Sequence, residues 1–142
     1  MHQCLSKGIS FLLALLLTIQ VFGHNPQVST LAFNKTPSSS WNFMLRAPLL
    51  SFQLALEHQF PKTNVNGLTP EEFKHLLKNH LQNSIVVNTD NGRSISMDSI
   101  TVALGHEVLI IGKLDSTVAF SSIQSISNHF FSTLNDHFSI LS

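Results

Sequence analysis

The sequence predicts a mainly α-helical fold with one small β-hairpin, built as a single small domain behind a cleaved signal peptide. Three observations predict this fold class. Apolar residues recur at helical spacing in four segments, 49–59, 70–82, 98–111 and 118–140. A Thr-Pro-Glu-Glu helix start begins at Thr69, and an Asn-Gly turn stands at residues 91–92. The chain of 142 residues suffices for one domain, which we assign to residues 46–142.

Residues 1–23 have the organisation of a secretory signal peptide. Lys7 precedes an apolar run from Ile9 to Val21, and Gly23 offers a small residue at the cleavage point. The run is shorter than the ~20 residues that span a bilayer, which favours a cleaved peptide over an uncleaved signal anchor. We therefore expect a secreted, extracellular protein with no stable membrane insertion.

Removal of this peptide leaves a nearly neutral chain. Seven Lys or Arg and eight Asp or Glu remain, and the single cysteine, Cys4, is lost with the peptide. The charge balance provides no basic surface for phosphates, so nucleic acid is excluded as a partner. Thiol nucleophiles and cysteine zinc sites are excluded for want of a thiol. Without a disulfide, the fold depends on its apolar core.

The first mature segment, residues 24–45, is predicted to be an extended, flexible arm. Pro26, Pro37 and the serines at 38–40 interrupt any sustained apolar period. The arm contains the sequon Asn34-Lys35-Thr36. In a secreted protein this makes Asn34 a candidate glycosylation site.

Two helices follow the arm. The first, over 49–59, begins after Pro48 and ends before Pro61. The second, over 70–82, has the strongest start signal, with Thr69 as N-cap and Glu72 at the capping-box position. Its apolar positions form one stripe, made of Phe73, Leu76, Leu77 and Leu81.

The rest of the chain is predicted as a hairpin and two more helices. Residues 84–96 form the hairpin, because a β-branched run precedes the Asn91-Gly92 pair that tight turns favour. A third helix over 98–111 has apolar positions at Ile100, Ala103, Leu104 and Val108. A fourth, over 118–140, has apolar positions at Phe120, Ile123, Ile126, Phe130, Leu134 and Phe138. Phe130, Phe131 and Phe138 are interpreted as core residues.

Candidate chemistry is sparse. Seven histidines remain after cleavage, but no pair has the i, i+4 spacing with an adjacent Glu that a helical zinc site uses. His58, His75 and His106 lie on three predicted helices and are the one set that a fold could bring together. A nucleophile elbow and a phosphate-binding glycine loop are both absent from the sequence. We predict no catalytic, cofactor-binding or metal site, and no cofactor.

Two stretches of the chain carry a resemblance. Residues 49–57 are followed by Leu68-Thr69-Pro70-Glu71-Glu72, and then by residues 84–104 with Val86-Val87 before Asp90 and Gly92. Over about residues 47–112 this order resembles the amino-terminal, non-catalytic region of the long secreted vertebrate peptidoglycan recognition proteins. In that N-acetylmuramoyl-L-alanine amidase family, two His and one Cys hold zinc in a carboxy-terminal α/β domain. The mature chain has no Cys and ends before such a domain would begin, so no ligand residue is carried over.

Two functions follow as hypotheses. The resemblance implies a secreted, non-catalytic accessory or interaction module of innate immunity, which is not an enzyme. The alternative is an unrelated small secreted helical protein that binds an apolar ligand or a protein partner through its Phe-rich last helix. Both hypotheses name a protein or an apolar ligand as the partner, and neither defines the oligomeric state.

Overall fold

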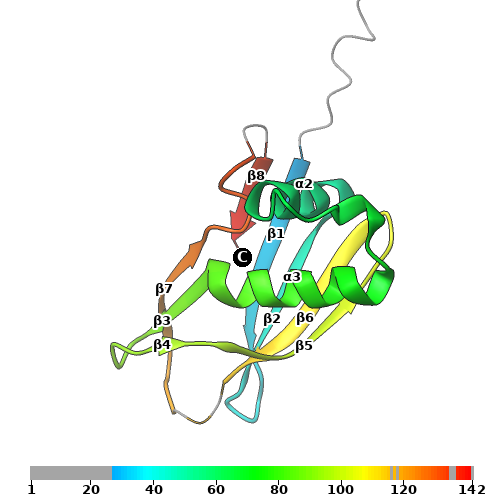
Figure 1. Cartoon of the computed structure of the whole chain (residues 1–142). Helices are drawn as coiled ribbons and strands as arrows, with labels where there is room; N and C mark the ends of the chain where they lie inside the picture. The colour runs from blue at the N-terminus through cyan, green and yellow to red at the C-terminus, as the bar shows by residue number, and fades with distance from the viewer. Residues whose placement is uncertain (1–26, 116, 118, 135–136, 142) are drawn as a thin grey trace, which may run out of the picture.

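A computed structural model describes residues 27–115, 117, 119–134 and 137–141 of the chain. The described part is a mixed α/β fold with eight strands and two α-helices, so the predicted mainly helical fold class is wrong (Figure 1). The strands form a five-stranded and a three-stranded sheet. The predicted signal peptide and residues 24–26 of the predicted arm lie outside the described residues.

The larger sheet has the strand order β5-β6-β2-β1-β8. Neighbouring strands are antiparallel except β1 and β8, which run parallel. The first and last described strands of the chain therefore lie side by side. The members of the sheet are β1 (Gln27–Lys35), β2 (Trp41–Pro48), β5 (Met97–Ala103), β6 (Glu107–Leu114) and β8 (His137–Leu141).

The smaller sheet has the order β4-β3-β7 and is antiparallel throughout. Its members are β3 (Ile85–Thr89), β4 (Ser94–Ile95) and β7 (Ile123–Asn128). β4 and β5 are separated by Ser96 alone, so one bent segment joins the two sheets. The predicted hairpin near 84–96 is confirmed, because β3 and β4 pair across a turn in which Gly92 has a φ of 74°. That left-handed conformation is one that glycine adopts without strain.

The first two predicted helices are confirmed. They are α2 (Leu49–Gln59) and α3 (Pro70–Ser84), with a short 3₁₀ turn, η2 (Val65–Gly67), between them. Thr69 and Glu72 form the predicted capping box. The Thr69 backbone N–H and hydroxyl donate to the Glu72 carboxylate, and these hydrogen bonds lower the pKa of Glu72. Local capping signals therefore fixed the start of α3 correctly.

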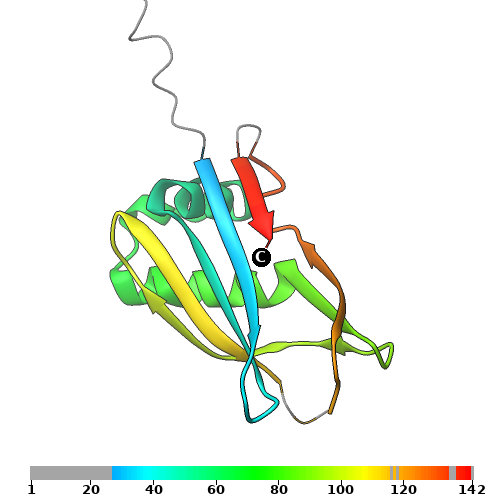
Figure 2. The same cartoon turned by 180° about the vertical axis from the view of Figure 1, so that it is seen from behind.

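Both helices cover the same face of the five-stranded sheet. Figures 1 and 2 show this face and the opposite one, on which no described helix lies. Side chains of the sheet alternate between the core and this open face. The largest fully buried apolar side chains are Phe43, Phe52, Phe130, Leu31, Leu45, Leu56, Leu77, Leu81, Ile110, Val87 and Val108. Burying one such side chain contributes about 1.5–3 kcal/mol to stability.

The predicted flexible arm is wrong for residues 27–45, which form β1 and most of β2. In β2, the buried Phe43 and Leu45 alternate with the exposed Met44 and Arg46, which is the period of a strand buried on one face. Pro37 and its neighbouring serines, which suggested an arm, occupy only the tight β1–β2 turn, where Ser39 has a φ of 64°.

The two later helices are also wrong. Residues 98–111 form most of β5 and β6, and 118–140 contain β7 and most of β8. In β6, Val108, Ile110 and Leu114 are buried at every second or fourth position, and β-branched residues favour a strand. The apolar spacing that predicted helices in these segments also fits two strands joined by a turn, because the turn interrupts the two-residue alternation of a strand.

A glycine allows close packing at the middle of the larger sheet. Gly112 of β6 lies opposite Phe43 of β2. A Cβ atom at Gly112 would lie 2.6 Å from Cε1 of Phe43 and 2.9 Å from the carbonyl oxygen of Asp98. The Phe43 ring therefore occupies the space that a side chain at 112 would need.

We expect Gly112→Ala to lower the free energy of unfolding by about 1–3 kcal/mol, because the ring and the β5 backbone must move. Urea denaturation measures this change. Gly67→Ala is the control, since its Cβ would meet only the exposed side chain of Asn64. Equal stability of the two variants would contradict the proposed tight packing.

Candidate functional site

The candidate site is the free edge of β8, where the five-stranded sheet ends. β8 is the terminal strand of that sheet, and β7 is a terminal strand of the smaller sheet. Figure 1 shows the two strands on the same side of the molecule. A terminal strand presents unpaired backbone N–H and C=O groups along one side. The geometry of β8 therefore determines what this edge can bind.

Hydrogen bonds between small side chains hold β8 against β1. Ser29 and Ser139 are cross-strand partners, and their hydroxyl oxygens lie 2.9 Å apart in a hydrogen bond. Ser29 is fully buried. At the start of β1, the buried Ser51 hydroxyl of α2 donates to Oε1 of Gln27 over 3.0 Å. These polar contacts fasten the β1–β8 pair to the helical layer.

An aromatic cluster anchors the segment that leads into β8. Phe130 and Phe131 are 1% and 4% exposed, so both are core residues as predicted. Their ring centroids lie 5.3 and 5.1 Å from that of Phe52 on α2, and the His80 ring of α3 lies 4.5 Å from Phe130. The Phe138 side chain, also predicted as core, lies outside the described part of the structure.

Backbone hydrogen bonds fix the same segment. The N–H of His129 donates to the carbonyl of Ser84, at the end of α3, over 2.9 Å. The N–H of Phe130 donates to Oδ1 of Asn128 over 3.1 Å. The turn at 129–134, which precedes β8 in the chain, is thus tied to both helices.

The described end of β8 remains open. Ile140 is 53% exposed and Leu141 is 58% exposed. A small depression of about 130 Å³ lies between β8 and β7, lined by Leu31, Ile126, Asn128, Ser139, Ile140 and Leu141. It places an apolar recess beside the free edge of the strand.

Two other edge strands, β5 and β4, carry protection that β8 lacks. β5, at the opposite end of the larger sheet, contains Asp98 and an irregular register between Asp98 and Thr101. β4 is only two residues long. Charges, bulges and short length all hinder pairing with another strand. β7 and β8 contain no proline and, apart from His137, no ionisable side chain. Their free edges can therefore pair with another strand.

A larger depression of about 280 Å³ beside Trp41 is a less suitable binding site. The Trp41 ring stacks on Phe120 at 5.9 Å, and Nζ of Lys35 lies 5.9 Å from the ring centroid. Neighbouring side chains of the protein thus already contact the ring that a ligand would use. These contacts hold the 119–122 segment against the β1–β2 turn.

The residues predicted as functional are dispersed. Asn34 is exposed at the end of β1, on the open face of the larger sheet. His58 lies on α2, His75 on α3 and His106 in the β5–β6 turn. Within the described ranges, no group of three His, Cys, Asp or Glu side chains could hold a metal ion. Neither described helix is long and apolar enough to cross a membrane.

Sequence reasoning missed the β8 edge because it assigned these residues to a helix. The available signal was the uncharged composition of His137–Leu141, which is typical of a strand. That signal does not identify an edge, because the partner strand β1 is about a hundred residues earlier in the chain.

Searches against protein-family models, curated proteins and solved structures find no match to this chain.

The half-buried His80, which packs in the aromatic cluster, makes the stability of the fold depend on pH. Burial lowers the pKa of His80, and its ring lies between Phe60 and Phe130. The Ser84 hydroxyl donates to the His80 carbonyl over 2.7 Å. With a lowered folded-state pKa, the unfolded chain binds more protons just below the ordinary pKa. Protonation therefore favours unfolding.

We expect the free energy of unfolding to fall as pH decreases from about 7.5 to 5.5, the range in which histidine titrates. His80→Gln should weaken this dependence, because its amide does not ionise. Urea titrations across the range measure the effect. His75→Gln, at an exposed position on the same helix, is the matched control. An unchanged pH dependence in His80→Gln would contradict this assignment.

Proposed function

We propose that this chain is a secreted, non-catalytic interaction module that binds an extended, uncharged segment of a partner polypeptide beside β8. The single observation that carries the proposal is the edge of β8, which no described strand covers, with Ile140 and Leu141 exposed next to an apolar recess. The resemblance to the amino-terminal region of long peptidoglycan recognition proteins is a further reason to propose an accessory role in innate immunity.

Strand addition suits this edge on physical grounds. Backbone groups of an added strand pair with the free N–H and C=O groups of β8, and alternate side chains reach opposite faces of the sheet. Ser139 faces the buried Ser29, whereas Ile140 is paired in register with Thr30 on the open face. Each new hydrogen bond contributes about 0.5–1.5 kcal/mol. Exposed apolar side chains on β8 add contact area.

An extended peptide fits better than a small apolar ligand. The alternative hypothesis placed that ligand on a Phe-rich last helix, but this region forms β7, a turn and β8. Phe130 and Phe131, which would have lined the helix, are buried. The recess of about 130 Å³ is below the ~300–1,000 Å³ of typical small-molecule sites. The surface therefore favours a polypeptide that lies along the edge.

We expect a random-peptide display library, selected on the purified mature chain, to yield sequences with alternating apolar residues. Ile140→Lys should weaken binding of a selected peptide at least tenfold in fluorescence anisotropy, because it places a charge at the edge. Leu104→Lys is the matched control, since Leu104 is 37% exposed and directly follows β5, at the opposite end of the larger sheet from β8. N-methylation of alternate peptide amides removes hydrogen-bond donors. It should abolish binding only for the set of amides that points toward β8.

Two results would overturn the proposal. Equal loss of binding in Leu104→Lys and Ile140→Lys would place the peptide elsewhere. A concentration-dependent dimer in analytical ultracentrifugation that Ile140→Lys disrupts would make a second copy of this chain the occupant of the edge.

The non-catalytic part of the proposal has its own test. We expect the purified mature chain, with stoichiometric zinc at neutral pH, to release no muramic-acid-linked peptide from peptidoglycan. Amide hydrolysis of that kind needs an activated metal-bound water, normally on three protein ligands. Release above the buffer rate that disappears in His106→Ala would make the protein an enzyme.

A further inference from the structure

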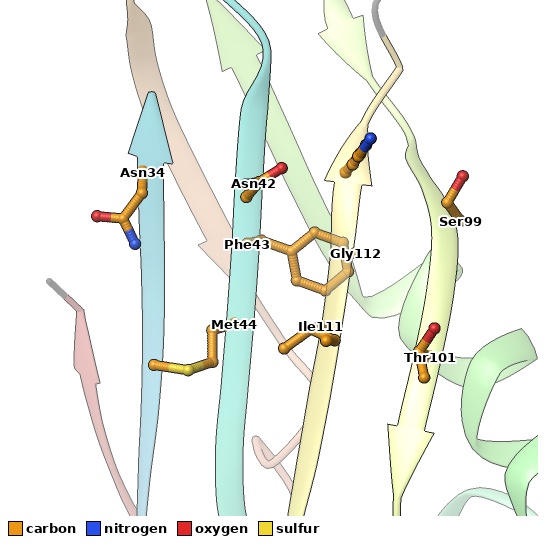
Figure 3. A pocket seen from close by; sticks show the side chains of 9 residues that line it. Asn34, Asn42, Phe43, Met44, Ser99, Thr101, Ile111 and Gly112 are labelled. Atoms are coloured by element: carbon orange, nitrogen blue, oxygen red, sulfur yellow. The ribbon is translucent and has the colours of Figure 1, made fainter. Parts of the chain in front are cut away.

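The open face of the five-stranded sheet presents apolar side chains to solvent. Met44 of β2 and Ile111 of β6 are cross-strand partners on this face, and they are 36% and 46% exposed. Figure 3 shows both side chains on the same side of the sheet. Arg46 and Glu107 form an ion pair toward one end of the face. The apolar pair thus lies on a surface that none of the described helices covers.

A depression of about 350 Å³ adjoins this apolar pair. Its polar lining comes from four strands and consists of Asn34, Asn42, Ser99, Thr101 and Lys113. Asn34 is the cross-strand partner of Asn42, which in turn pairs with Lys113. This polar row lies two residues, or about 7 Å, along the strands from the row of Met44 and Ile111.

We propose that Asn34 carries an N-linked glycan whose first sugars lie over this depression and cover Met44 and Ile111. The inference rests on the proposed secretion, because the glycan is added in the secretory pathway. Asn34-Lys35-Thr36 supplies the acceptor sequence, and Asn34 is exposed at the edge of the depression. Its side chain shares a face with Met44 (Figure 3).

The covalent step is a glycosyl transfer from a lipid-linked oligosaccharide pyrophosphate. A bond forms between Nδ2 of Asn34 and C1 of the first N-acetylglucosamine. The bond from C1 to the pyrophosphate oxygen breaks with its electron pair, and the lipid pyrophosphate leaves. Nδ2 gives up one proton to the base of the host transferase, so no oxidant or reductant is needed.

The lining of the depression matches the chemistry of these sugars. The hydroxyls of Ser99 and Thr101 both donate and accept hydrogen bonds, and the Lys113 ammonium donates them. Sugar hydroxyls and the acetamido group provide the complementary partners. The apolar surface of a sugar ring and its acetamido methyl can pack on Met44 and Ile111. The polar and apolar rows therefore suit one amphipathic occupant.

The size of the face disfavours a second copy of the chain as the occupant. Five strands cover about 24 Å across, and seven residues extend about 23 Å, giving roughly 550 Å². A stable protein interface buries about 800 Å² per partner. A tethered glycan needs no such area, because its covalent bond keeps it beside the surface.

Expression of the full chain, with its own leader, in mammalian cells tests the attachment. Asn34→Gln and Thr36→Ala should both lose the mass shift that peptide-N-glycosidase removes from the wild type. Thr36→Ser is the matched control, because it retains the sequon and the hydroxyl. Retention in the cell without a glycan would overturn the secretion and the inference together. An unglycosylated wild-type protein in the medium would overturn the inference alone.

Oxidation of methionine tests the covering. Dilute peroxide converts exposed methionine to its sulfoxide, and mass spectrometry quantifies each site. We expect Met44 to oxidise at least about threefold more slowly in the glycosylated protein than in Asn34→Gln. Met97, which is 3% exposed, is the internal control and should react slowly in both proteins. Equal Met44 rates in the two proteins would show that the glycan points away from the sheet and would overturn the inference.

Discussion

The contact of Phe52 with Phe130 and Phe131 determines where the last part of the chain lies. Phe52 is fully buried on α2, immediately after the first two strands, whereas its partners precede β8. This contact brings the carboxy-terminal segment against the helices, from which β8 can reach β1. The Ser29–Ser139 hydrogen bond then sets the register of the pair. The edge that we propose as a binding site therefore depends on aromatic packing in the core.

Both described helices lie on one face of the larger sheet, so the two faces of the sheet have different roles. The inner surface holds the core, in which Leu45 and Ile110 are completely buried. The outer surface retains exposed apolar groups and the polar row that includes Asn34. Strand alternation makes this possible, because Met44 is exposed on one side of β2 while Phe43 is buried on the other. One strand thus contributes to stability and to a candidate modification surface.

Sequence reasoning succeeded where the signal is local. Thr69, Pro70 and Glu72 define the start of α3 within four residues, and the Asn91-Gly92 pair defines a turn. The sequon at Asn34 is also a short local motif, and its glycosylation stays a prediction. In the larger sheet, β1–β2 and β5–β6 pair across short turns and were missed because their residues were interpreted as an arm and a helix. The β2–β6 and β1–β8 pairs join segments that are distant in the chain, which no local signal indicates. For β8, the partner is β1, and neither strand alone indicates the pairing.

The parallel pairing of β1 and β8 has a consequence for the order of assembly. Ser29 and Ser139, which meet across this pair, are 110 positions apart. During synthesis, the edge of β1 stays uncovered until almost the whole domain has been translated, because distant contacts form late. In that interval the unpaired backbone of β1 can pair with strands of other chains. The folding machinery of the cell must therefore protect this edge.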